Sequence, residues 1–233
     1  MTPDQAPVLP PLGRSTTRSD LVAASIKTAI LSGRLKPDEV LVERRIAEQL
    51  GVSKTPVREA LISLTSSGLL TPTRSRGVAV RRLRAEDVLR IYEMRALVEP
   101  WAAAQVAVAD GFDASEARQA LDDAARFVEA DDQAGLSLAN RRFHRSLYST
   151  CPNTLVVSTL DDLQDLTALG TVSLLWEQWP TWRDEVQEHR DVLAAVTEHR
   201  AADAEHLLRS HIERSIGRLR AARDRAVEPA PAG

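Results

Sequence analysis

The chain has 233 residues with a formal net charge of −3, and 43% of them are hydrophobic. No hydrophobic run approaches the roughly 18–20 residues that a membrane helix needs, and the N-terminus lacks an apolar signal core, so we expect a cytoplasmic protein with no membrane partner. The single cysteine, Cys151, excludes an intrachain disulfide framework and is expected to be a small buried or half-buried residue.

Caps, breaks and apolar periodicity predict a mainly α fold with two domains. A disordered arm over residues 1–17 is followed by a winged helix-turn-helix domain over 18–83, an all-α bundle over 84–226 and a disordered tail over 227–233. The predicted helices fall near residues 19–32, 43–50, 54–67, 85–109, 113–130, 133–150, 153–175, 181–199 and 201–225.

Two short helices around Gly51 predict a helix-turn-helix. Ile46 and Leu50 share a face of the first helix, and Val57 and Leu61 share a face of the second, so the pair can pack across a tight glycine turn. Such a pair presents its second helix to the major groove of DNA.

The start of the second helix carries the residues suited to reading DNA. Its first turn holds Ser53, Lys54, Thr55 and Arg58, and a recognition helix meets bases and phosphates with its N-terminal residues. Ser53 is also a candidate N-cap. Arg58 offers a bidentate fork to guanine or a phosphate contact, whereas Lys54 acts as a point charge. The alternative, solvated groups on an ordinary helix, explains one basic residue better than a cluster.

The residues after this helix predict a two-stranded wing. Leu69 and Leu70 begin one strand, and alternating Val78 and Val80 form the other. The tip between them is expected to reach a neighbouring groove or the DNA backbone with Arg74, Arg76 and Gly77.

The near-neutral total charge hides two halves of opposite sign. Residues 14–84 hold 14 Lys/Arg and 6 Asp/Glu, a net charge of +8, whereas residues 85–233 hold 16 and 26, a net charge of −10. A basic module attracts DNA and releases its counterions, so its binding depends strongly on salt. The acidic half is not expected to touch DNA.

The acidic half contains all five histidines: His144, His189, His199, His206 and His211. Asn140 and His144 are four residues apart and share a helix face. His189 and His211 lie on the last two helices, which a short connection should fold antiparallel, so they can face each other. Three imidazoles and an oxygen suit a divalent transition metal. Histidines of the surface or core are common too, and His199 and His206 are assigned to the surface.

Two other features of the bundle have structural consequences. Pro100 is expected to kink helix 85–109 or mark a local break. A group of aromatic residues can line a pocket mouth, although core packing or a dimer contact is the commoner role for Trp176, Trp179 and Trp182.

These residues resemble a known family. The winged helix-turn-helix of GntR-type transcriptional regulators is similar to the stretch LVERRIAEQLGVSKTPVREALISLTSSGLLTPTRSRGVAV. The C-terminal ligand-binding domain of the FadR-like branch, the FCD domain, resembles NRRFHRSLY, EHRDVLAAV and LLRSHIERS. The resemblance covers about residues 19–222. It implies a regulator, usually a repressor and not an enzyme, that binds a double-stranded DNA operator as a homodimer and responds to a small carboxylate effector.

The resemblance also implies site residues. Its DNA contacts fall on Arg44, Ser53, Lys54, Thr55, Arg58, Arg76 and Gly77, and its metal ligands fall on Asn140, His144, His189 and His211. The metal would be a divalent transition ion such as Zn²⁺ or Ni²⁺. Arginine is more usual at the position of Lys54, and aspartate at that of Asn140. A neutral amide oxygen binds a cation more weakly than a carboxylate does, so a weaker or differently selective site, or one completed by an anionic effector, is expected.

An effector contact is implied for Arg95, which is similar to an arginine that reaches into the cavity and would bind a carboxylate. An i,i+4 pair with Glu99 is the alternative. Two other functions stay open at this point: a DNA-tethered metalloenzyme and an architectural DNA-binding protein. An enzyme needs a general base near the metal, and Glu188 beside His189 points to a different helix face.

Overall fold

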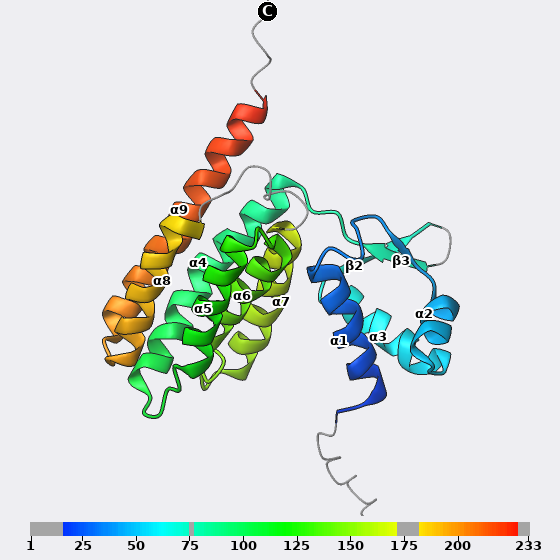
Figure 1. Cartoon of the computed structure of the whole chain (residues 1–233), viewed down its shortest axis with the longest axis horizontal. Helices are drawn as coiled ribbons and strands as arrows, with labels where there is room; N and C mark the ends of the chain where they lie inside the picture. The colour runs from blue at the N-terminus through cyan, green and yellow to red at the C-terminus, as the bar shows by residue number, and fades with distance from the viewer. Residues whose placement is uncertain (1–15, 75–76, 172–181, 228–233) are drawn as a thin grey trace, which may run out of the picture.

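The computed structural model of the chain describes residues 16–74, 77–171 and 182–227. A small N-terminal module lies beside a bundle of long helices (Figure 1). Residues 1–15, the predicted tail from residue 228, Arg76, Trp176 and Trp179 lie outside the described residues, and Trp182 is described only by its backbone. No helix in the described ranges is long and apolar enough to cross a membrane.

The N-terminal module is a winged helix-turn-helix, as predicted. Its elements are α1 (Arg18–Leu31), β1 (Val40–Leu41), α2 (Glu43–Leu50), α3 (Lys54–Ser66), β2 (Leu70–Thr73) and β3 (Gly77–Val80). The strands form an antiparallel sheet in the order β1-β3-β2. The short strand β1 was not predicted, because two residues are too few to show an alternating pattern.

The turn between α2 and α3 depends on Gly51. This residue has a φ of +65°, in the left-handed region that glycine enters without steric cost. Ser53 then takes the extended N-cap conformation before α3, and its hydroxyl makes no capping hydrogen bond. The predicted face is buried on α3, where Val57 and Leu61 are 0% and 5% exposed. On α2 it is buried only in part, because Ile46 is 9% exposed but Leu50, the last residue of the helix, is 40% exposed. The sharp turn therefore holds α3 across α2 with its first turn at the surface.

The second module is an all-α bundle. Its helices are α4 (Ala85–Val108), α5 (Ser115–Glu129), α6 (Gln133–Ser146), α7 (Thr154–Gly170), α8 (Trp182–Thr197) and α9 (Ala201–Val227). They differ from the predicted ranges mainly at the end of α6, which stops at Ser146 instead of residue 150; the end predicted for α7, residues 172–175, lies outside the described residues. Cys151 is buried at 4% exposure, as predicted.

Of the two outcomes predicted at Pro100, a kink or a local break, the break is wrong, because α4 runs through this residue without interruption; the kink stays a prediction. Proline has no N–H, so the carbonyl of Ala96, four residues earlier, receives no hydrogen bond from it. A side chain of α9 supplies the missing donor: Arg209 Nη1 donates to Ala96 O over 2.8 Å. The distant arginine thus satisfies the carbonyl that the proline leaves free.

We expect Arg209→Ala to lower the free energy of unfolding by about 1–3 kcal/mol, because it leaves a carbonyl of α4 without its donor. Urea denaturation measures the change. Arg209 also pairs with Glu205 at 2.9 Å near the surface, so Glu205→Ala is the matched control and should cost less than about 1 kcal/mol. Equal losses in both variants would show that the Ala96 contact contributes nothing.

Candidate metal centre and DNA-binding surface

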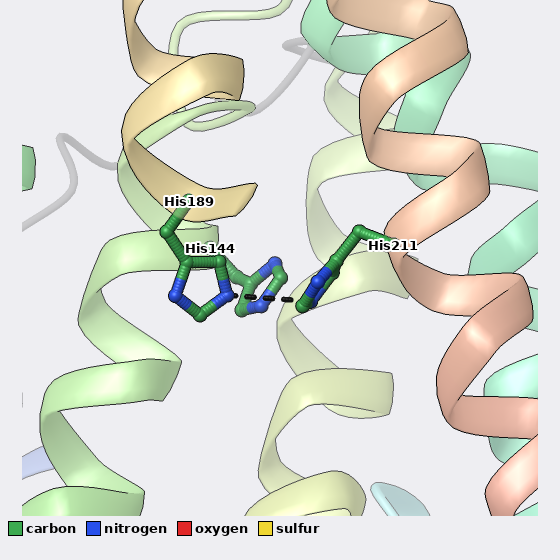
Figure 2. Close-up of side chains that lie close together, drawn as sticks. All are labelled: His144, His189 and His211. Carbon is green, nitrogen blue, oxygen red and sulfur yellow. Dashed lines mark hydrogen bonds between the residues drawn. The ribbon is translucent and has the colours of Figure 1, made fainter. Parts of the chain in front are cut away.

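Three histidines from three helices meet inside the bundle: His144 of α6, His189 of α8 and His211 of α9 (Figure 2). All three are buried, and one candidate ligand atom of each lies within 4.8 Å of the others. The Nε2 atoms of His189 and His211 are 3.3 Å apart. Two nitrogens bound to one zinc ion at tetrahedral angles lie about 3.3–3.4 Å apart. The cluster therefore has the dimensions of a metal site.

Two carboxylates orient two of these rings. His144 Nδ1 donates to Glu99 Oε1 over 2.7 Å, and His211 Nδ1 donates to Glu188 Oε2 over 2.7 Å. An imidazole whose Nδ1 proton is held by a carboxylate presents its Nε2 lone pair to a metal. Glu188 was set aside in the sequence because it neighbours His189 and faces elsewhere. It does face elsewhere, and there it supports His211.

Asn140 lies one helical turn before His144 on α6. Its Oδ1 is buried and has no hydrogen-bond partner among the described residues. A buried acceptor without a donor is unfavourable by about 1–3 kcal/mol. Coordination to a cation would satisfy this oxygen, and an amide oxygen beside imidazoles suits a divalent transition metal. Asn140 as the fourth ligand stays a prediction.

Glu99 governs the electrostatics of the site. Burial by itself would raise its pKa, but the attraction of Arg95 and His144 outweighs burial and lowers the pKa to about 2. Burial lowers the pKa of His144 to about 4 against the opposing effect of Glu99. Burial and the neighbouring His211 also hold the pKa of His189 well below its usual value. His144 and His189 are therefore neutral at pH 7, the form that metal binding requires.

Arg95 forms the pair with Glu99 that the sequence offered as the alternative to an effector contact. Its Nε lies 2.8 Å from Glu99 Oε2, and the side chain is 1% exposed. Its Nη2 lies 3.4 Å from His144 Nδ1, and its Nη1 donates to Thr167 Oγ1 over 3.4 Å. Arg95 is therefore in the wall of the histidine site with its charge already balanced. A direct contact between Arg95 and an effector stays a prediction.

The candidate DNA surface lies on the N-terminal module. The seven predicted contact residues that the structure describes are all exposed: Arg44, Ser53, Lys54, Thr55, Arg58, Arg74 and Gly77. A groove of about 650 Å³ between α2, α3 and β3 brings together Arg44, Lys54, Arg58 and Gly77. The side chains of Arg44 and Arg58 are 74% and 63% exposed. The basic residues of this groove thus come from α2 and α3, and β3 of the wing closes it with Gly77 and Val78.

Several neighbours of these sites could not be found from the sequence. Gln164 of α7 donates its Nε2 to Glu99 Oε2 over 3.1 Å and is fully buried, but it belongs to no motif. Lys27 of α1 reaches Asp165 of α7, and nothing local marks either residue. The sequence did indicate the contact between Arg95 and Glu99, because oppositely charged residues four positions apart in a helix lie on the same face.

This architecture, a winged helix-turn-helix followed by a helical domain with a buried histidine cluster, defines a DNA-binding regulator with a separate ligand domain. Residues 18–80 match the family model described as bacterial regulatory proteins, gntR family, and residues 90–214 match the FCD domain. The chain belongs to the GntR family of transcriptional regulators and carries an FCD domain.

Similar proteins are regulators as well. A probable D-xylose utilization operon transcriptional repressor of Paenarthrobacter nicotinovorans is 28% identical over 84% of this chain and 86% of its own length. An uncharacterized HTH-type regulator of Agrobacterium vitis is 32% identical over 58% of this chain and 83% of its own. A solved putative GntR regulator from Rhodococcus has a TM-score of 0.74 and 26% identity, covering 88% of this chain and 98% of that one. The metalloenzyme alternative finds no support among them.

We expect Asn140→Asp to tighten the binding of Zn²⁺ by on the order of tenfold, about 1.4 kcal/mol, because a carboxylate replaces a neutral oxygen ligand. Competition with a chromogenic chelator at neutral pH measures the affinity. Asn153→Asp is the matched control, since Asn153 is the N-cap of α7 and aspartate caps a helix equally well. Unchanged affinity in Asn140→Asp would remove Asn140 from the ligand set.

Proposed function

We propose that the protein is a transcriptional repressor whose helical domain binds a divalent transition metal, Zn²⁺ or Ni²⁺, together with a small carboxylate effector. It would act in the cytoplasm as a homodimer on a double-stranded DNA operator. The observation that carries the proposal is the buried cluster of His144, His189 and His211, which lies against the Arg95–Glu99 pair. His144 and His189 offer neutral imidazoles beside a buried ion pair, Arg95 with Glu99, whose charges are already balanced.

The residues proposed to hold the metal are Asn140, His144, His189 and His211. When bound, the metal would supply positive charge and open coordination positions for carboxylate oxygens. The chain's own residues offer little of that charge, because Arg95 is neutralised by Glu99 at 2.8 Å. A carboxylate that entered without a metal would be a buried anion, and Arg95, the cation that the described residues place beside the cluster, is already paired, so its burial would be costly. This argument favours effector binding that depends on metal.

A buried ion pair connects this site to the DNA-binding module. Lys27 Nζ of α1 lies 2.5 Å from Asp165 Oδ2, and Arg141 Nε of α6 lies 2.5 Å from Asp165 Oδ1. Asp165 is 0% exposed. It follows Gln164, which donates to Glu99, and Arg141 follows Asn140. On each of the two helices, a residue of the effector region is therefore followed directly by a residue of the contact between the domains.

Regulation then follows from a difference in affinity. An effector that binds more tightly to one arrangement of α6 and α7 favours that arrangement. Because Asp165 of α7 contacts Lys27 of α1, the position of α1 shifts with it. The orientation of α3 and the wing toward DNA then changes as well. Coupling between two such sites is typically about 1–3 kcal/mol. The direction of the shift, repression relieved by the ligand, is taken from the family resemblance.

The proposed homodimer is supported by an apolar stripe on α4. Met94, Leu97, Trp101 and Val108 follow helical spacing along one face and are 45%, 67%, 39% and 70% exposed. Exposed apolar residues along one helix face are typical of a protein contact. Two subunits paired there would place their recognition helices in successive major grooves. Light scattering that gives the mass of one chain would contradict the homodimer.

A thermal-shift screen of chelator-treated protein tests the proposal. Zn²⁺ or Ni²⁺ should raise Tm, and a small carboxylate should raise it further only in the presence of the metal, because ligands stabilise the folded state that binds them. His144→Ala should remove both responses, whereas the control His206→Ala, at an exposed position, should keep them. A carboxylate response without metal would contradict the metal requirement. No response to any metal or acid would favour an architectural DNA-binding protein.

A further inference from the structure

Glu43 contacts Arg58 across the helix-turn-helix. Arg58 Nε donates to Glu43 Oε1 and Arg58 Nη2 donates to Glu43 Oε2, each over 3.0 Å. Glu43 lies in the first turn of α2 and Arg58 in the first half of α3. The paired contact joins the supporting helix to the recognition helix, and it fixes both the position and the plane of the guanidinium.

The contact leaves the reading edge of Arg58 available. Glu43 occupies the side formed by Nε and one hydrogen of Nη2, so Nη1 and the second hydrogen of Nη2 remain at the end of the guanidinium. Two parallel N–H donors at this end match the O6 and N7 acceptors of guanine. An arginine already held in one orientation loses less side-chain freedom when it binds a base.

An acidic residue on this surface otherwise opposes DNA binding. Glu43 lines the same groove as Arg44, Lys54 and Arg58, and its carboxylate would repel phosphates. Its place near the N-terminus of α2 is favourable for the helix dipole, but that does not explain two hydrogen bonds to another helix. Glu48 differs, because it makes one 3.4 Å contact to Arg44 on its own helix and is 64% exposed.

We propose that Glu43 is a positioning residue that orients Arg58 for base recognition. It increases the discrimination between operator and other DNA and weakens binding to DNA in general. The inference rests on the DNA-binding half of the proposed function and is independent of the metal and the effector.

The test compares two duplexes with the full chain. One duplex is selected by the wild-type protein from a random-sequence pool, and the other is its scrambled version. We expect Glu43→Ala to lower the ratio of the two affinities by about tenfold, the range associated with one bidentate base contact, while affinity for the scrambled duplex stays equal or rises. Glu43→Gln keeps one acceptor oxygen for Arg58 and should give an intermediate ratio.

Glu48→Ala is the matched control, because it removes the same charge from the same helix. It should raise both affinities by a similar factor and leave their ratio unchanged. The ratio does not depend on the fraction of folded protein, since partial unfolding weakens both affinities equally.

Two results would overturn the proposal. If Glu43→Ala keeps the wild-type ratio and behaves like Glu48→Ala, Glu43 contributes only charge. If Arg58→Ala keeps the ratio, Arg58 does not read bases and has nothing for Glu43 to position. DNA binding itself would stand in both cases, because both duplexes would still bind.

Discussion

The buried carboxylate of Glu99 is the constraint on which the helical domain depends. Its oxygens contact Arg95 on its own helix, His144 of α6 and Gln164 of α7, so one side chain joins three helices. A buried charge persists only when its partners satisfy it. Because Glu99 also neutralises Arg95 and orients His144, Arg95 has no unbalanced charge to offer an incoming anion. For this reason we propose that a metal ion supplies the positive charge that a carboxylate effector needs in this site.

The same helices extend this constraint to the DNA-binding module. Asp165 is adjacent to Gln164 and is held by Lys27 and Arg141. A buried carboxylate between two cations has few alternative arrangements, so a displacement of α7 has to move Lys27 or break the contact. At the other end of the module, Glu43 pairs with Arg58 at the surface. Paired charges thus occur at the effector region, at the junction between domains and at the DNA surface.

The sequence was sufficient where local rules apply. Gly51 and the faces of α2 and α3 predicted the helix-turn-helix, and the histidine positions predicted a cluster that the structure brings together. It was insufficient where the partner is remote. Pro100 suggested a kink or a break, and the break was wrong because nothing local shows that Arg209 replaces the lost donor. Contacts between helices, such as that of Gln164 with Glu99, depend on how the helices pack, and no periodic pattern in the sequence indicates them.

Affinity for the selected duplex, measured with and without ligand, tests most directly whether the helical domain controls DNA binding. The protein is compared after chelation and after loading with the metal and the carboxylate that stabilise it. We predict that the affinity of the wild type for the duplex differs about 5–150-fold between the two states. This difference should be much smaller in Lys27→Met. The control Lys36→Met, at an exposed position of the same module, should keep the wild-type difference. Equal affinities in the two states of the wild type would contradict control by the helical domain, and an unchanged response in Lys27→Met would contradict the route through Asp165.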